Sequence, residues 1–334
     1  MKKTSTILGF VVVLYLLVGG LYGLSDAVSA EIMLRYAGDL PVGNHLTRGQ
    51  DFFAERVKEL SKGRVEIQVF SAGTLFTDKD FNKAVPSGAV DMGLTLISRW
   101  SGIVPAANFT ELPLFFDGWP HAWRVYDSEV GEIISKDMEK AGVKVLFWMQ
   151  DGKAAIASKK PMKTLDDFKG KRVRVPSELG AYTIKALGGA PVFMGGGEVY
   201  LALQRGTVDA GISSVTSFVD RKYYEITKYI TEPNFMFGLY ACVINLNKWN
   251  SLPPDVQKIL KAAGEKTQEW GRGEVEKSDS TALAELKKRG MDVYDLPKAE
   301  KEAWRNALKP VYDVVLKSCG ADGQKMFDSA NKAR

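Results

Sequence analysis

The alternation of hydrophobic and polar positions from residue 31 onward predicts short strands separated by longer helices. Hydrophobic residues at every second position mark the strands, and hydrophobic residues three and four apart mark the helices. The predicted strands are residues 32–37, 64–70, 143–149, 154–158, 172–175 and 208–212. The predicted helices are residues 45–61 and segments near 120–140, 179–187 and 198–205. This order is typical of an α/β fold with mainly parallel strands.

The last third of the chain has a different pattern. Residues 254–289 read as one long, highly charged helix, followed by a short strand at 291–294 and a further helix from Lys298. A helix of that length is expected to run across two lobes, with most of its charges in solvent. No flexible linker separates the two halves, so we expect several short connections that allow the lobes to hinge.

A six-residue frame, Gly-x-Val-Asp-x-Gly, occurs twice. It lies in "SGAVDMGL" (87–94) and in "RGTVDAGI" (205–212), each time between a predicted helix and an apolar strand. Glycine suits the end of a helix and aspartate suits a turn. The repeat predicts two lobes built alike, and a coincidence of a short frame is the alternative.

The N-terminus has the features of a secretory signal. Lys2 and Lys3 precede an apolar run at 7–24, and Val-Ser-Ala at 28–30 fits a cleavage site after Ala30. An uncleaved membrane anchor is the competing interpretation, because the run is close to the length that spans a bilayer. The formal charge of +5 is spread without a basic block, so nucleic acid is not an expected partner.

The residues that most enzymes need are scarce. His45 and His121 are the only histidines, and there is no H-E-x-x-H, G-x-S-x-G or C-x-x-C motif. Both histidines lie at helix starts and read as local polar groups. The cysteines, Cys242 and Cys319, are interpreted as separate thiols, with one long-range disulfide as the alternative. Neither suggests a metal site or a nucleophile.

Two segments have features of a ligand-binding site. "GKRVRVP" (170–176) alternates valine and arginine, so Arg172 and Arg174 share one face of a strand, which indicates either a solvated edge or an anion site. "GGAPVFMGGGEVY" (188–200), which includes Gly196, lacks the P-loop and dinucleotide spacings. Its glycines leave backbone open to an anion or simply form a turn.

Longer stretches resemble a known family. "SKKPMKTLDDFKGKRVRVP", "ALGGAPVFMGGGEVYLALQRGTVDAG" and "FVDRKYYEITKYI" strongly resemble the solute-binding proteins of tripartite ATP-independent periplasmic (TRAP) transporters, the DctP-like family. "SGAVDMGL", "LPLFF" and "SLPPDVQKIL" extend the resemblance over residues 31–334. It implies a two-lobed α/β periplasmic binding protein of type II, each lobe having a mixed or mainly parallel sheet, with a long helix spanning both lobes.

The resemblance also implies a division of the chain. Residues 1–30 are the signal peptide, residues 31–150 and about 238–278 form lobe I, and residues 151–237 and about 279–334 form lobe II with the spanning helix. The function that the resemblance implies is that of a periplasmic receptor, which binds an organic carboxylate between the lobes and delivers it to the small and large membrane subunits of the permease. We expect a monomer without cofactor, metal or catalytic activity.

The family's carboxylate-binding arginine falls at Arg174. Ser177 would donate to the same carboxylate or cap the following helix, and Asn44 would meet the cleft or act as an N-cap. The resemblance places an acidic residue, an arginine, an aromatic residue and an asparagine of the sialic-acid-binding branch at Leu96, at Ala154 beside Lys153, at the glycines around Gly196 and at Ser213. This chain lacks these residue types there, so sialic acid is not an expected ligand.

The missing polar groups favour a monocarboxylate with an apolar or aromatic body. Trp100, Phe218 and Phe237 follow strand ends, where ligand clefts form in α/β folds, so they are candidate contacts as well as candidate core residues. The rival functions are a binding protein for an ATP-driven transporter, a ligand sensor for a membrane kinase and, less supported by the motifs, a secreted hydrolase or lyase.

Overall fold

The structure is a computed structural model that describes residues 30–334, so residues 1–29 of the expected signal peptide lie outside the described residues. Within the described part, nine strands form one sheet in the order β2-β1-β3-β8-β4-β7-β5-β6, and β9 pairs with β8. The strands are β1 (Ile32–Gly38), β2 (Val65–Phe70), β3 (Met92–Leu96), β4 (Val143–Ser158), β5 (Arg172–Val175), β6 (Ala190–Phe193), β7 (Ala210–Ser214), β8 (Tyr229–Asn245) and β9 (Asp292–Tyr294).

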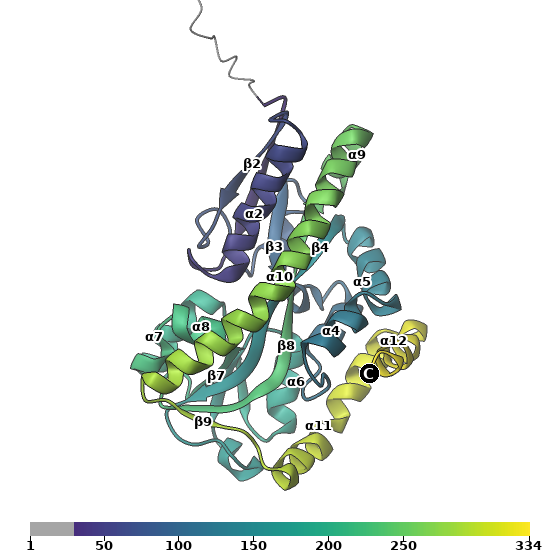
Figure 1. Cartoon of the computed structure of the whole chain (residues 1–334). Coiled ribbons are helices and arrows are strands. Elements are labelled where there is room, and N and C mark those ends of the chain that lie inside the picture. Colours follow the sequence, from purple (N-terminus) through teal and green to yellow (C-terminus); the bar gives the residue numbers. More distant parts are fainter. Residues whose placement is uncertain (1–29) are drawn as a thin grey trace, which may run out of the picture.

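Helices cover this sheet and surround both of its ends (Figure 1). The α-helices are α2 (His45–Leu60), α3 (Phe81–Ala84), α4 (Trp119–Tyr126), α5 (Glu129–Lys140), α6 (Glu178–Ala186), α7 (Val199–Arg205), α8 (Val215–Asp220), α9 (Leu246–Ser251), α10 (Pro254–Lys288), α11 (Lys298–Ser318) and α12 (Ala321–Lys332). Short 3-10 helices include η2 (Ile97–Trp100), η3 (Pro105–Glu111), η4 (Leu165–Phe168), η5 (Gly196–Glu198) and η6 (Tyr223–Glu225). The predicted α/β class with two lobes and a spanning helix is confirmed.

Two long strands connect the lobes. β4 and β8 pair antiparallel along nearly their whole length, whereas β1, β2 and β3 at one end and β5, β6 and β7 at the other pair in parallel. The sequence predicts 143–149 and 154–158 as separate strands, but both belong to β4. The sheet is therefore continuous, and its register shifts near residues 150–156 mark the passage between the lobes.

The repeated frame has the same geometry in both lobes. Gly88 and Gly206 both have left-handed backbone, with φ of 77° and 71°. Asp91 accepts hydrogen bonds from the backbone N and Nε of Arg35 at 2.9 and 3.3 Å, and Asp209 accepts the same two from Arg172 at 2.9 and 3.2 Å. The two lobes are thus built alike around this turn.

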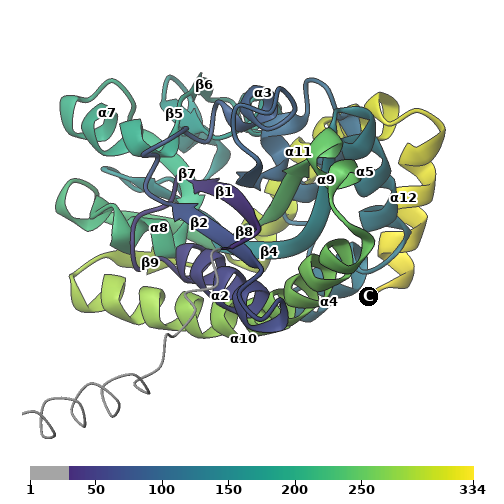
Figure 2. The ribbon, with the colours of Figure 1, turned by 90° about the horizontal axis from the view of Figure 1, so that it is seen from above.

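Helix α10 lies across both lobes (Figures 1 and 2). Leu260 and Ala263 pack in the core of the first lobe, and Ala282 and Leu286 pack in the core of the second. Glycines let the helix approach β4 closely: a Cβ at Gly264 would lie 2.9 Å from the Phe147 ring. The helix therefore belongs to the folded core of each lobe.

The two C-terminal helices pack on different partners. α11 packs against α6 and η3, whereas α12 packs against α5 and α4. The sequence assigns all of residues 279–334 to lobe II, yet α5 comes from the segment assigned to lobe I. The exact domain bounds remain a prediction.

The structure also bears on the predicted capped turn, the two cysteines and His121. Thr164 and Asp167 form a capping box around η4, as the capped turn predicts. Cys242 and Cys319 are both free thiols, which excludes the disulfide alternative in this structure. His121 accepts from the Asp117 amide and contacts the Ala330 carbonyl, so it is a buried polar group that joins α4 to α12. Within residues 30–334, no helix combines the length and hydrophobicity needed to cross a membrane.

Two glycine variants of α10 test its close packing. Gly264 is buried against Phe147, whereas Gly273 is exposed, and a Cβ added there would have no atom within 4 Å. Both alanine substitutions gain helix propensity of about 1 kcal/mol, but Gly264→Ala also overpacks the contact with β4 at a cost of about 1–3 kcal/mol. Denaturant unfolding should therefore show Gly273→Ala more stable than Gly264→Ala by about 1–3 kcal/mol. Equal stability of the two variants would contradict the packing.

Candidate functional site

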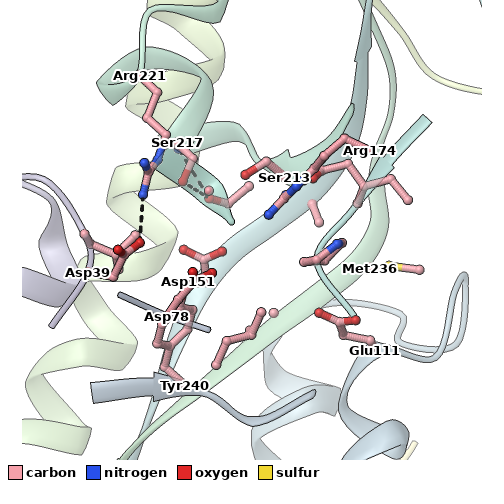
Figure 3. Close-up of a pocket in the computed structure, with 18 residues that line it drawn as sticks. Asp39, Asp78, Glu111, Asp151, Arg174, Ser213, Ser217, Arg221, Met236 and Tyr240 are labelled. Carbon is pink, nitrogen blue, oxygen red and sulfur yellow. Dashed lines mark hydrogen bonds and ion pairs between the residues drawn. The ribbon is translucent and has the colours of Figure 1, made fainter. Parts of the chain in front are cut away.

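A pocket lies between the two lobes, where β4 and β8 cross from one to the other (Figure 3). Its lining combines charged, hydroxyl and apolar side chains from both halves of the chain. The lining residues are Asp39, Leu40, Asp78, Leu96, Glu111, Asp151, Ala154, Arg174, Pro176, Gly196, Ile212, Ser213, Ser214, Ser217, Arg221, Met236, Gly238 and Tyr240. An enclosed pocket with converging charges between two lobes is a site for a small polar ligand.

Arg174 reaches this pocket from β5 and is only 3% exposed. Its Nε and Nη2 donate to the carbonyl of Met194 at 3.2 and 3.1 Å, and its Nη1 donates to the carbonyl of Ile212 at 2.6 Å. Burial lowers its pKa. Among the described residues no carboxylate forms an ion pair with it, so a buried positive charge faces the pocket with neutral partners only.

The internal repeat shows what is unusual about Arg174. In the second lobe Arg174 pairs with Gly211, the last glycine of the repeated frame. In the first lobe the equivalent pair is Ala37 with Gly93, and Ala37 is fully buried in the hydrophobic core. A small apolar residue therefore satisfies this position in one lobe. The repeated frame by itself therefore does not call for an arginine at this position.

Two of the pocket's acids already have cationic partners. Asp39 forms an ion pair with Arg221 at 3.4 Å, and Asp78 forms a buried pair with Arg99 at 2.6 Å. Enclosure raises the pKa of Asp39 to about 6, and the nearby Asp78 carboxylate adds to the rise. Both acids of the first lobe are therefore paired before any ligand binds.

Asp151 lies at an irregularity of the central strands. Gln150 pairs with Leu239 and Gly152 pairs with Gly238, so Asp151 has no residue opposite it, and such a bulge re-aims a side chain. Gly238 leaves space for it, since a Cβ there would lie 3.1 Å from the Asp151 Cβ. Enclosure raises the pKa of Asp151 to about 7, although Ser214 counteracts the rise.

Several contacts join the lobes around the pocket. Besides the pair of Asp39 with Arg221, the amide of Asn44 donates to Asp220 at 2.6 Å, and Lys79 pairs with Glu198. The first member of each pair comes from the segment assigned to lobe I and the second from that assigned to lobe II. The structure is therefore a closed arrangement of the two lobes.

Other sequence-predicted residues fall into two groups. Ser213 and Gly196 line the pocket with Arg174, and so do Leu96 and Ala154, where the sialic-acid branch differs. Asn44 instead caps α2 by accepting from the Leu46 amide at 2.9 Å, and it lines a separate groove beside α10.

Ser177 and Lys153 lie outside the pocket lining. Ser177 caps α6 by accepting from the Gly180 amide at 3.0 Å, and its hydroxyl donates to Glu111, which does line the pocket. The backbone amide of Lys153 donates to Asp279 at 3.1 Å. Ser177 can therefore act on a ligand only through Glu111.

The three candidate aromatic contacts are core residues. Trp100 is fully buried and donates to Thr95 at 3.0 Å, Phe218 packs on Tyr223, and Phe237 packs edge-on against Trp119. None of the three lines the pocket, which agrees with the alternative that they are core residues. Their side chains point into the hydrophobic layers, where large apolar surfaces are most stable.

The sequence interpretation missed most of the charged lining: Asp39, Asp78, Glu111, Asp151 and Arg221. Asp39 follows the end of β1, and polar residues directly after a parallel strand are a usable signal. The bulge that directs Asp151 has no comparable signal. Within residues 30–334, no group of three histidine, cysteine or acidic side chains is arranged to hold a metal ion.

Comparison with known families gives this pocket its context. The family "Bacterial extracellular solute-binding protein, family 7", or DctP, matches residues 38–318. The chain belongs to this family. Family 7 proteins are solute-binding receptors, so this chain is a DctP-like TRAP solute receptor, and the similarity favours the TRAP type over the ATP-driven type.

Individual family 7 relatives are similar over most of the chain. The C4-dicarboxylate-binding periplasmic protein DctP of Rhodobacter capsulatus is 27% identical, with 89% of this chain and 90% of the relative covered. A TRAP periplasmic solute-binding protein of Desulfovibrio desulfuricans with bound sn-glycerol-3-phosphate is 29% identical at a TM-score of 0.86, covering 90% and 97% of the two chains. One from Roseobacter denitrificans with bound β-D-glucuronate is 28% identical at 0.84, covering 89% and 98%.

The raised pKa of Asp151 predicts a specific pH dependence. The folded, ligand-free protein keeps this proton up to about pH 7, whereas the unfolded chain releases it near the ordinary value of 3.8. The folded state therefore loses stability as pH rises from about 3.8 to about 7, and the loss is complete above pH 7, where the carboxyl is charged in both states. Asp151→Asn removes that cost, so its stability advantage over the wild type should grow by about 1 kcal/mol between about pH 6 and about pH 8.

Denaturant unfolding of both proteins at the two pH values measures this difference. Asp166→Asn, at an exposed carboxylate paired with Lys169, serves as the control and should show no such change. An advantage of Asp151→Asn that is the same at both pH values would show that the carboxyl is not enclosed.

Proposed function

We propose that this protein is a periplasmic receptor that holds an organic acid on Arg174 between its two lobes and delivers it to a TRAP permease. The observation that carries the proposal is the buried guanidinium of Arg174, which faces the interlobe pocket without a carboxylate partner among the described residues. A guanidinium can donate two parallel hydrogen bonds to a carboxylate. The bound acid would supply the negatively charged partner that Arg174 lacks within the protein.

The ligands of the relatives support an acidic solute. The three relatives described above bind a C4-dicarboxylate, sn-glycerol-3-phosphate and β-D-glucuronate, according to their descriptions. These differ in size and polarity, but each carries an anionic group. We therefore propose an organic anion for this chain and derive its other features from the pocket.

The rest of the ligand would contact an apolar part of the lining. Leu96, Ile212 and Met236 line the pocket together with the ring of Tyr240, which is the one aromatic ring in the lining among residues 30–334. A monocarboxylate with a modest apolar body fits this surface. The contacts we expected from Trp100, Phe218 and Phe237 are replaced by these aliphatic side chains.

Binding between the lobes would favour the closed arrangement. Arg174 belongs to one lobe, whereas Asp39 and Asp78 belong to the other, so a ligand that contacts both sides stabilises closure by its differential affinity. The closed receptor would then be recognised by the membrane subunits and release the solute unchanged, as a monomer without cofactor or catalytic step. Residues 1–30 would direct it to the periplasm.

Replacement of Arg174 by lysine tests the proposal. Mass spectrometry first identifies the acid that remains bound to the natively purified protein. Calorimetric titration of that acid should then show Arg174→Lys binding roughly 10- to 150-fold more weakly, because the loss of one charge-assisted hydrogen bond costs about 1.5–3 kcal/mol.

Arg172→Lys is the matched control. Arg172 lies on the same strand, but it is exposed and pairs with Asp209, so its substitution should leave affinity within about twofold. Thermal unfolding of both variants without ligand shows whether each is folded. Unchanged affinity in a folded Arg174→Lys variant, or a chemically altered solute after incubation, would refute the proposal.

A further inference from the structure

The charges that line the pocket do not all have partners within the protein. Asp39 is paired with Arg221 and Asp78 with Arg99. Glu111 accepts from Ser177, and burial raises its pKa. Arg174, Glu111 and Asp151 are the charged groups of the described lining that have no ion-pair partner, and of the two acids only Asp151 has a buried oxygen without a hydrogen-bond partner.

Asp151 has its own evidence of an unmet interaction. Its Oδ1 atom is buried and has no hydrogen-bond partner among the described residues. The bulge in β4 directs the side chain into the pocket, and Figure 3 shows it on the side of Asp39, Asp78 and Tyr240, away from Arg174. An unpartnered buried acceptor is costly, so a structure that retains one at a ligand site favours a donor in the ligand.

A solute whose only polar group is a carboxylate would leave the buried Asp151 oxygen without a hydrogen-bond donor. Its carboxylate would neutralise Arg174, but Asp151 would then be enclosed with a second negative charge nearby. Closure would also remove water from the Asp151 carboxyl, which increases the cost of its charge. A dicarboxylate would add a further repulsion, because Asp39 and Asp78 lie on the same side of the pocket as Asp151.

We propose that the solute is a zwitterion, an amino acid in the broad sense, whose carboxylate binds Arg174 and whose ammonium group binds Asp151. This inference rests on the proposed function and specifies its substrate class. An ammonium group supplies both the missing charge and up to three donors, whereas a hydroxyl supplies one donor and no charge. The apolar body between the two groups would lie against Leu96, Ile212 and Met236.

Matched sets of acids test the proposal even while the natural solute is unidentified. Each set contains an unsubstituted five- or six-carbon monocarboxylate, its hydroxy acid and its amino acid, with the substituent on carbon 2, 3 or 4. Thermal shift on protein freed of bound solute, at about pH 8, selects the best set, and calorimetry measures its three members. The amino acid should bind at least about 30-fold more tightly than the other two members.

Substitutions test whether the affinity advantage of the amino acid depends on Asp151. In Asp151→Asn the advantage of the amino acid should fall below about threefold, while the unsubstituted acid binds at least as well as to the wild type, since a repulsive charge is gone. Asp166→Asn, an exposed acid outside the pocket, should keep the full advantage. Arg174→Lys should weaken all three members.

The outcomes separate the two proposals. If acids bind but the amino member has no advantage over the hydroxy or unsubstituted member, the zwitterion inference is wrong and the receptor function stands. That comparison uses the wild-type protein, so it holds even if Asp151→Asn fails to fold. If no member of any set binds, both the inference and the proposed organic-acid function are contradicted.

Discussion

The proposed binding site depends on one buried positive charge that the protein itself leaves without a negative partner. Moving a guanidinium out of water is costly, and carbonyl dipoles compensate only part of that cost. Arg174 is nevertheless almost fully buried, held by the carbonyls of Met194 and Ile212. The carboxylate of the solute would compensate the rest of this desolvation cost, and that compensation would contribute to the binding free energy.

The central sheet allows the Arg174 charge to be buried in a pocket that a solute can still enter when the lobes move apart. β4 and β8 run unbroken from one lobe to the other, so the lobes are joined by paired strands and not by a flexible tether. The register irregularities between residues 150 and 156 fall at the pocket, where they allow the strands to bend and direct Asp151 inward. Contacts such as Asn44 with Asp220 then hold the closed form at its rim.

Much of the fold follows from local patterns in the sequence. The period of hydrophobic residues predicts β1, α2, β5 and the whole of α10, and the repeated glycine-aspartate frame predicts two lobes built alike. β8 is not predicted, because a strand buried on both faces has no alternation, and Gly238 interrupts its apolar run. The union of two predicted segments into β4 depends on pairing with β8, which no local pattern indicates.

The site is less evident from the sequence. Arg174 stands out because two arginines alternate with valines, and the structure assigns them different partners: Asp209 for Arg172 and backbone carbonyls for Arg174. The aromatic candidates do not line the pocket, because position near a strand end does not determine which way a side chain points. Asp151 could not be selected, since its role arises from a bulge that depends on the pairing of distant strands.

The most direct test is a crystal structure of the receptor with the solute that it retains through purification. We predict that the acid group lies within about 3.2 Å of the Arg174 guanidinium in a closed, water-excluding pocket. A bound solute whose acid group is held by other residues, with Arg174 still engaged only by Met194 and Ile212, would contradict this prediction.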